Sequence, residues 1–444
     1  MKGTDVPLKQ IWKLAFPLIL SLLAQNLVNV TDTAFLSRVG VTELGASAIA
    51  GVYYMVFYML GFGFSVGLQI IIARRNGERA YAKIGPVVEN GVLFLLLLAV
   101  VLILGSRLLT PVLLPVVLQS EELVTACTKF LNIRILGLLF SAFNMGFRAL
   151  HIGRKNTGAI SMAALIMATS NVVLDYLLIF GKLGFPKMGL EGAAWASVAA
   201  DGLSALYFVL QASHRSIRRH YALYKFAPVN IALLKHILGI SIYTMLQYFV
   251  SISTWLTFFL VIEKTGEANL ASSNIIRSLY GLISIPTWAF GSVMASLTGN
   301  VIGAGRMDKV FPQMYKVAFL GFVTALATNL PVALFPGFFL SVYTSDPAMA
   351  LLTRPSLFVV LGAHQCLAVA LVIFNVVSGT GKTQVAMWIE LAVLVVYVTA
   401  LQALAWYFPT RPEMIWYSEW VYWTLLGLAA WFYLRTGRWK RASV

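Results

Sequence analysis

Three carboxylates lie inside long apolar segments in the first half of this 444-residue chain: Asp32, Asp175 and Asp201. A charge held deep in an apolar segment is costly, so such residues usually face the protein interior and bind a proton or an ion. Carboxylates that share an apolar site repel one another, and at least one of them is therefore expected to hold a proton. Their oxygens could instead coordinate a desolvated Na⁺, and these residues alone leave both possibilities open.

Helical spacing places further polar side chains beside these carboxylates. Three helical faces are expected: Gln25, Asn29 and Asp32; Asn171 and Asp175; Ser197 and Asp201. Residues three, four or seven positions apart share a helix face, and a polar face within a membrane must meet protein or water rather than lipid. A hydrogen-bonded seam between helices is the alternative reading of such amides.

Two arginines and one proline also lie within apolar segments. Arg134 and Arg277 could each neutralise a neighbouring carboxylate or contact a ligand. Pro17 removes a backbone hydrogen bond from the first segment and is expected to kink it. This kink could act as a hinge when Asp32 changes charge, or it could be a static feature of packing. Glu390 falls near the predicted end of a segment and is interpreted as a polar cap.

The composition identifies the elements that must position these residues. The chain is 59% hydrophobic and only 11% charged, with a mean hydropathy of +0.82, whereas a soluble domain carries about a quarter charged residues. Apolar runs repeatedly reach the length of about 20 residues that a bilayer span needs. Twelve spans are predicted, at roughly 11–36, 44–73, 86–106, 127–150, 158–181, 189–212, 236–262, 269–298, 313–335, 355–378, 385–408 and 416–434. The sequence therefore predicts an all-α integral membrane protein of twelve transmembrane helices.

The net charge of +16 is explained by the distribution of basic residues among the loops. Alternate loops and both ends carry 22 Lys and Arg residues, against 7 in the opposite loops. The positive-inside rule then places both termini in the cytoplasm and removes the need for a nucleic-acid partner. Cys127 and Cys366 show neither a disulfide framework nor metal-ligand spacing.

The second half of the chain repeats the first at an offset of 226 residues. Several residues recur at this offset, among them Phe64 with Phe290 and Gly153 with Gly379. Two six-helix lobes of equal orientation are expected, at residues 1–212 and 236–444, joined by a basic cytoplasmic linker at 213–235, with a cavity between them. The segment Gly379–Thr383 imitates a phosphate-binding loop but lacks its first glycine and follows a helix, so it is interpreted as a helix-to-helix turn.

Three stretches resemble one transporter family. The segment NVVLDYLLIFGKLGFPKMGLEG at 171–192, followed by AAWASVAAD, resembles the fifth and sixth helices of the multidrug and toxic compound extrusion (MATE) family. The first span, LAFPLILSLLAQNLVNVTDTAFLSRVG, is similar to the opening helix of that family, and FLNIR at 130–134 resembles a motif of its DinF-like branch. The resemblance implies two six-helix bundles and export of organic cations or amphipathic compounds in exchange for H⁺ or Na⁺.

The resemblance also implies roles for single residues. In the DinF-like branch the cation site lies in the first lobe, which implicates Asp32, Asn171 and Asp175, with Ser197 at a position that is often threonine and Asp201 where some relatives hold another acid. Asp32, Asn171 and Asp175 are the candidates for Na⁺ coordination. The other large bacterial branch places acids in its seventh and tenth helices. This chain has Phe249 and Leu367 there, which argues against a second-lobe cation site.

The expected protein is thus a monomeric antiporter of the plasma (inner) membrane, not an enzyme, whose only cofactor is the coupling ion. Candidates for its substrate cavity are Gln25, Asn29, Tyr53, Tyr54, Phe57, Arg134, Arg277 and Trp288, since aromatic faces attract flat cations. A lipid-linked precursor flippase is the alternative, although its cavity would need more cationic side chains. A receptor or scaffold would not need three intramembrane carboxylates.

Overall fold

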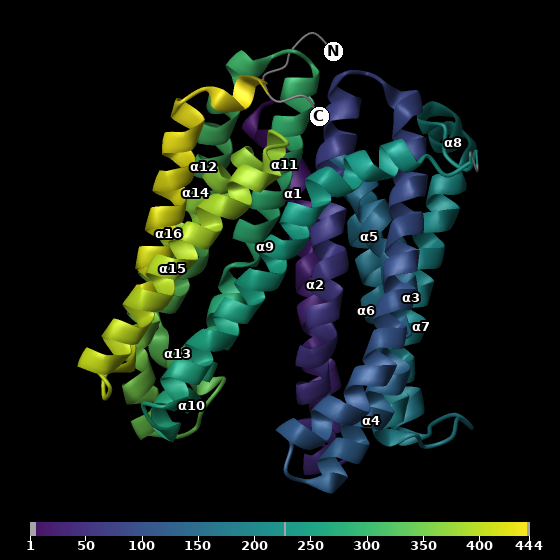
Figure 1. Cartoon of the computed structure of the whole chain (residues 1–444). Helices are drawn as coiled ribbons and strands as arrows, with labels where there is room; N and C mark the ends of the chain where they lie inside the picture. The colour runs from purple at the N-terminus through teal and green to yellow at the C-terminus, as the bar shows by residue number, and fades with distance from the viewer. Residues whose placement is uncertain (1–5, 226–227, 442–444) are drawn as a thin grey trace. The chain divides into compact units, whose positions relative to one another are not determined.

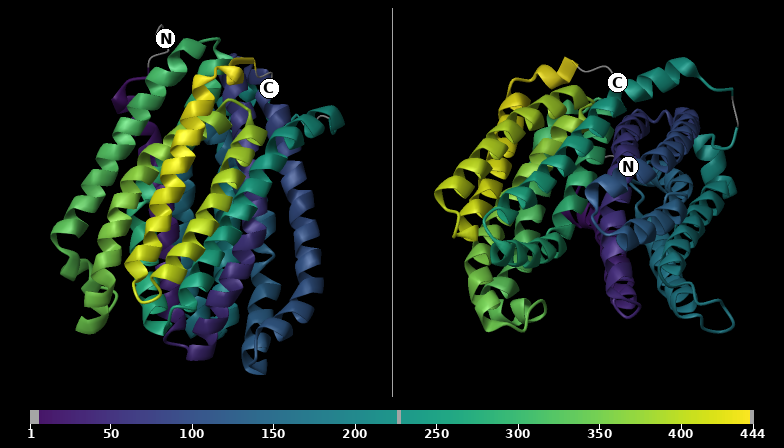
Figure 2. Two further views of the ribbon diagram at one scale, coloured as in Figure 1. Left: turned by 60° about the vertical axis from the view of Figure 1, so that its left-hand side comes forward. Right: turned by 60° about the horizontal axis from the view of Figure 1, so that its bottom comes forward.

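The computed structural model describes residues 6–225 and 228–441, and every regular element in these ranges is helical (Figures 1 and 2). The helices that carry the first half are α1 (Leu8–Leu36), α2 (Val41–Gly77), η1 (Tyr81–Lys83), α3 (Ile84–Val117), α4 (Glu121–Arg134), α5 (Gly137–Gly153), α6 (Gly158–Phe180), α7 (Gly189–Ser213) and α8 (Arg215–Tyr221). Those of the second half are α9 (Ile231–Glu263), α10 (Glu267–Ile283), α11 (Ile285–Gly303), η2 (Met307–Lys309), α12 (Val310–Leu334), α13 (Pro336–Ser341), α14 (Pro347–Gly379), α15 (Thr383–Tyr407), α16 (Pro412–Arg435) and η3 (Arg438–Arg441).

Twelve helical segments match the twelve predicted spans. Nine helices in the described ranges are long and apolar enough to cross a membrane, and the bent pairs α4–α5 and α10–α11 raise the number to eleven. The twelfth is α16, whose 24 residues exceed the roughly 20 that a span needs. The fold prediction of an all-α membrane protein in two six-helix bundles is therefore confirmed.

The repeat of 226 residues is visible in the helix bounds. Adding this offset to α2 gives the outer bounds of α10 and α11, and adding it to η1 gives η2. The same step carries the bent pair α4–α5 onto the single helix α14. The two halves therefore share one element order, but each breaks a different span.

Of the two helix breaks, the one between α10 and α11 has a local cause in the sequence, and the one between α4 and α5 does not. In the second half, Pro286 stands in the first turn of α11, and the chain bends by 48° there. Proline suits this position because it has no N–H to leave unpaired. In the first half the 47° bend follows Arg134, and the residues between α4 and α5 include no proline.

Two compact units make up the chain. One spans Leu20–Met245, here called the N-terminal unit; the other combines Leu246–Val444 with the chain up to Ile19, here called the C-terminal unit. Helices α1 and α9 are both divided between the units, and the two division points are themselves 226 residues apart. α1 continues as one helix through Pro17, which lies two residues before its division point.

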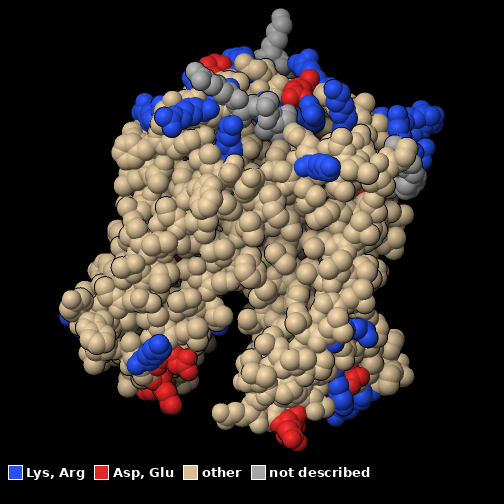
Figure 3. Space-filling view, viewed as in Figure 1, with Lys and Arg blue, Asp and Glu red and all other residues tan. Residues whose placement is uncertain are grey.

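Each unit is organised around its fourth span. In the N-terminal unit α5 packs against α2, α3 and α7, and in the C-terminal unit α14 packs against α11, α12 and α16. Lys and Arg residues, drawn in blue in Figure 3, gather between α2 and α3 in the N-terminal unit and at the start of α12 in the C-terminal unit. The segment predicted as a linker contains the short basic helix α8.

Candidate functional site

The N-terminal unit brings two carboxylates of distant spans onto one amide. Asn171 lies on α6 one turn before Asp175, and both side chains face Asp32 of α1. With its nitrogen toward the carboxylates, the Asn171 amide donates to Asp32 Oδ1 and to Asp175 Oδ2, both at 3.1 Å. The two carboxyl groups are also within hydrogen-bonding reach of each other. The sequence spacing of Asn171 and Asp175 thus produces the expected shared face.

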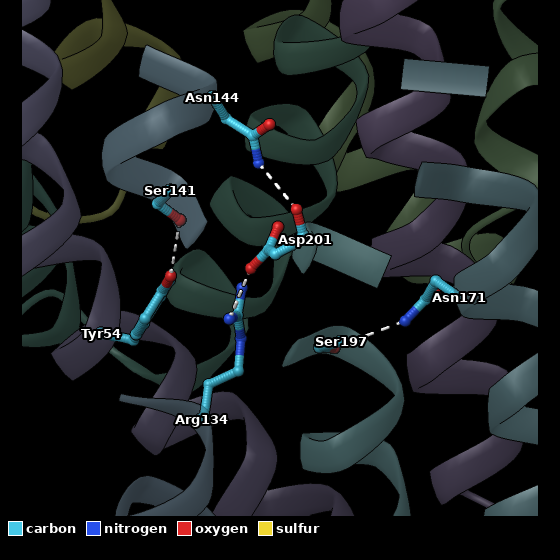
Figure 4. Close-up of polar contacts among 7 residues, drawn as sticks. All are labelled: Tyr54, Arg134, Ser141, Asn144, Asn171, Ser197 and Asp201. Atoms are coloured by element: carbon cyan, nitrogen blue, oxygen red, sulfur yellow. Dashed lines mark hydrogen bonds and ion pairs between the residues drawn. The ribbon is translucent and has the colours of Figure 1, made fainter. Parts of the chain in front are cut away.

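The same amide also joins this group to α7. In the orientation drawn in Figure 4, Asn171 Nδ2 donates to Ser197 Oγ at 3.4 Å. The amide oxygen then faces the two carboxylates, whereas in the first orientation it faces the Ser197 hydroxyl. The two orientations occupy the same volume and differ only in which atom meets the acids. With the oxygen inward, an acceptor faces acceptors, so a proton or a cation must lie between them.

Burial makes it costly for the carboxyl groups of Asp32 and Asp175 to be ionised. Asp175 is completely buried and Asn171 is 1% exposed, whereas Asp32 and Ser197 are partly accessible. Within the described residues, Asp175 Oδ1 has no hydrogen-bond partner. A buried carboxylate oxygen without a donor is costly unless it is protonated or bound to a cation. The group has the properties of an ion or proton site that is reached from the Asp32 side.

A second network surrounds Asp201 on α7. Arg134 Nη1 donates to Asp201 Oδ2 at 2.9 Å, and its guanidinium lies 4.0 Å from the centre of the Tyr54 ring (Figure 4). Tyr54 pairs with Ser141 at 3.3 Å, and Asn144 donates to the Asp201 backbone carbonyl at 3.1 Å. Arg134 ends α4 at the bend, which lets the side chain of this helix end reach α7.

The Asp201 network contains a cation that balances its carboxylate, and the Asp32–Asp175 group does not contain one among the described residues. Arg134 is within hydrogen-bonding distance of Asp201, and it acts on Asp32 only through space. The Arg134 guanidinium therefore neutralises Asp201 directly, and it forms no ion pair with Asp32 or Asp175 among the described residues. Of the two roles considered for Arg134, the structure shows neutralisation of a neighbouring acid. The Asp32–Asp175 pair still needs a proton or a cation of its own.

The predicted cavity residues fall into separate places. Gln25 and Asn29 are exposed on α1, and the Tyr53 and Phe57 rings pack in a tilted arrangement with centroids 5.0 Å apart. Two candidates belong to the C-terminal unit: Arg277 of α10 lies 5.3 Å from the centre of the Phe259 ring, and Trp288 of α11 is 44% exposed. Tyr54 is buried in the Arg134 network and is 8% exposed.

One sequence interpretation is wrong, and one residue was missed. Glu390 is not a polar cap: it lies two turns inside α15, is 4% exposed, and contacts Ser251 and Tyr422. Glu419 of α16 was given no role, although it is 3% exposed. The available signal was its spacing of four residues from Trp423, whose indole nitrogen donates to it at 3.0 Å.

Comparison with known proteins places the chain in a family. The MatE family model matches residues 17–177 and 241–415, well over half of the chain. The probable multidrug resistance protein NorM of Thermotoga maritima is 23% identical over 84% of this chain and 80% of its own length. The protein of the same name from Rhizobium meliloti is 26% identical over 79% and 76% of the two chains.

A solved structure shows the same fold over the whole length. It is described as the outward-facing conformation of a multidrug resistance MATE family transporter of the MOP superfamily. It superposes with a TM-score of 0.88 at 19% identity, covering 100% of this chain and 99% of that one. By the extent of the family-model match, this chain belongs to the MatE family.

Proposed function

We propose that this protein is a multidrug efflux antiporter of the plasma membrane that exchanges organic cations or amphipathic compounds for H⁺ or Na⁺. The relatives named multidrug resistance proteins support the transport class. The observation that carries the coupling proposal is the Asp32–Asn171–Asp175 group, whose two carboxylates form no ion pair with any cation in the described part of the chain. The uneven distribution of Lys and Arg supports cytoplasmic termini.

In this proposal the orientation of the Asn171 amide depends on whether the site has bound an ion. When both acids are ionised, the nitrogen faces them and donates to each. When a proton or Na⁺ is bound, the oxygen can face the acids, because it can accept from a protonated carboxyl or coordinate Na⁺. The nitrogen then turns to Ser197. Ion loading thus changes the hydrogen bonds between α1, α6 and α7.

Such a change can drive transport only if the ion binds one conformation better than the other. Asp32 and Asp175 belong to different helices, so protonation that removes their repulsion alters the preferred distance between α1 and α6. Pro17 weakens the backbone of α1 and is proposed as the hinge for this movement. The substrate surface is proposed to include Tyr53 and Phe57.

The flippase alternative gains no support from the cations of the described residues. Arg134, which a pyrophosphate group would require, is already paired with Asp201 at 2.9 Å. Arg277 lies against an aromatic ring at 5.3 Å. An organic cation needs neither residue as a direct ligand, so efflux of cations fits the arrangement better.

The test uses purified protein in liposomes that contain a pH-sensitive dye. Ethidium is added, and substrate-driven proton flux is compared for the wild type, Asp32→Asn and the control Asp308→Asn. Asp308 has a 61% exposed side chain and lies outside the spans. Flux in the wild type and control that is lost in Asp32→Asn supports proton exchange. Flux of ²²Na⁺ without proton movement would support Na⁺ coupling, and absence of both fluxes would contradict the proposal.

A further inference from the structure

The C-terminal unit buries two carboxylates that the proposed mechanism does not use. Glu390 of α15 is 4% exposed and Glu419 of α16 is 3% exposed. Neither forms an ion pair with a Lys, Arg or His side chain within the ranges that the structure describes. This differs from Asp201, whose charge is matched by Arg134. A buried charge without a partner is the costliest arrangement for a carboxylate.

The contacts of Glu390 can hold a protonated as well as an ionised carboxyl group. Its Oε1 meets the hydroxyls of Ser251 and Tyr422, the latter at 3.1 Å. The Gln247 side chain also borders the carboxyl group, and Oε2 has no hydrogen bond of good geometry within the described residues. Ser251 has one proton, and its hydroxyl also lies 2.8 Å from the Gln247 carbonyl oxygen, which can only accept. If Ser251 donates to this carbonyl, Glu390 must supply the proton in its contact with Ser251.

Glu419 has a different set of donors. Its Oε2 accepts from the Trp423 indole N–H at 3.0 Å, and its Oε1 lies 3.2 Å from the Tyr397 hydroxyl. The indole can only donate, whereas the phenol can either donate or accept. Glu419 can therefore be held in either protonation state, with Tyr397 reversing its role. The Tyr280 hydroxyl, 3.1 Å from the same indole nitrogen, borders the group on α10.

The two carboxyl groups share one aromatic wall. The Tyr397 and Tyr422 rings, each bonded to one of the acids, meet edge to face with centroids 5.4 Å apart. Tyr422 also packs on Trp423 at 4.6 Å. His364 of α14 is a titratable neighbour of Tyr280, and the two ring centroids are 6.2 Å apart. The His364 ring nitrogens contact Thr287 and Asn329. The Glu390 and Glu419 groups therefore lie in one cluster without a cation.

A purely structural seam would not need carboxyl groups here. A glutamine at either position could form hydrogen bonds of the same kind without the cost of ionisation. The unpartnered Glu390 Oε2 is the independent sign of exchange, because a 4% exposed side chain keeps a polar atom that nothing in the described residues satisfies. A proton on Oε2 leaves Oε1 free to accept from both Ser251 and Tyr422, whereas a proton on Oε1 is donated to Ser251.

We propose that Glu390 and Glu419 form a second proton-binding pair, located in the C-terminal unit and separate from the Asp32–Asp175 group. Each event is the simple uptake of a proton by a carboxylate oxygen, with Tyr422 and Tyr397 donating to the ionised forms. The role of the pair in a transport cycle rests on the proposed antiport function. Its ability to bind protons does not.

The first experiment measures protonation directly. Infrared difference spectra are recorded for purified protein in lipid nanodiscs as the pH is raised, and the C=O stretch of protonated buried carboxyl groups is followed. The variants are Glu390→Gln, Glu419→Gln and Asp32→Asn combined with Asp175→Asn. We expect the wild-type band to decrease with pH, each glutamine variant to lose part of the change, and the Asp variant to keep that part. A pH-dependent change that both glutamine variants retain in full would overturn the proposal.

Two further measurements keep folding and function separate. Glu390→Asp retains a carboxyl group, so it should keep the titrating C=O band. Glu390→Gln should lose that part of the band, and size-exclusion chromatography checks that this variant is folded. In liposomes, Glu390→Gln should lower the number of protons moved per ethidium, whereas an unchanged ratio would remove the pair from transport. If no variant and no wild type transports ethidium but the glutamine-sensitive band still titrates, the antiport proposal fails and the proton site remains.

Discussion

The two units use one element order to bury carboxylates in different surroundings. In the N-terminal unit, Asp32 and Asp175 meet an amide, and Asp201 meets a guanidinium at 2.9 Å. In the C-terminal unit, Glu390 and Glu419 meet hydroxyl groups, an indole N–H and the Gln247 side chain, and no Lys, Arg or His of the described residues forms an ion pair with them. The acids do not occupy equivalent positions of the repeat. A duplicated helical scaffold thus fixes where helices lie, while the neutralisation of charge is set residue by residue.

A second comparison concerns the helices divided between the units. The first half of α9 packs on α2, where Thr244 Oγ1 lies 2.7 Å from the Gly63 carbonyl oxygen and Ser241 donates to the Phe64 carbonyl at 3.3 Å. The start of α1 packs on α11 instead, where the ring centroids of Trp12 and Phe290 are 5.9 Å apart. Phe290 is the repeat partner of Phe64. The contact between α9 and α2 is thus made by hydroxyl groups that meet backbone carbonyls. The contact between α1 and α11 is made by aromatic rings.

The largest expected effect on transport comes from a change in the carboxylate pair of the N-terminal unit. Asp175→Asn removes an acid that is completely buried and shares a donor with Asp32. We expect substrate-driven proton flux in liposomes to fall by at least about tenfold, which corresponds to about 1.4 kcal/mol or more in the coupled step. Flux that stays near the wild-type value would move the coupling site away from α6. Asp308→Asn is the matched control because its carboxylate is exposed.

The Arg134–Asp201 pair should govern stability more than ion coupling. Arg134→Gln leaves Asp201, which is 8% exposed, without its cation, and removal of one partner of a buried pair typically costs about 3 kcal/mol or more. We expect a marked fall in the thermal unfolding temperature, followed by light scattering or fluorescence. Adding Asp201→Asn to the same variant should recover most of the loss. A double variant as unstable as the single one would show that the charge pair is not the cause.

The sequence predicted the spans well because hydropathy and loop charge act over whole helices. It also predicted the shared face of Asn171 and Asp175, since a spacing of four residues is local to one helix. The bend after Arg134 was not predictable from local signals because no proline marks it. Glu390 was misplaced for a related reason: its burial depends on Ser251 and Tyr422, which belong to other helices.

The glycine contact between α2 and α9 provides a test of the second comparison. A Cβ atom at Gly67 would lie 2.2 Å from Ser241 Oγ and 2.7 Å from its Cα, while the repeat partner of Gly67 in α11 is Val293, which is 2% exposed. Gly67→Val should therefore cost about 1–3 kcal/mol through overpacking. Thermal unfolding measures this loss. Gly105→Val is the control, because its Cβ would meet nothing within 4 Å, and an equal loss in the control would refute the packing explanation.

The smallest effect is expected at Ser197, which contacts Asn171 in both orientations of its amide. Ser197 is partly accessible, and its hydroxyl lies 3.4 Å from Asn171 Nδ2 in one orientation. In the other orientation the amide oxygen takes that place, and the same hydroxyl can donate to it. Ser197→Ala therefore removes one neutral hydrogen bond from both the ionised and the loaded site, and the two losses largely cancel. We expect the ion concentration for half-maximal flux to change by less than about twofold, below the roughly two- to tenfold effect of a neutral hydrogen bond lost from one state alone. Ser197→Thr keeps the hydroxyl and should behave as the wild type. A change of about tenfold or more in Ser197→Ala would show that Ser197 stabilises only one state of the site, and the N-terminal site would then need more than its carboxylates to bind the ion, unlike the pair that we propose for the C-terminal unit.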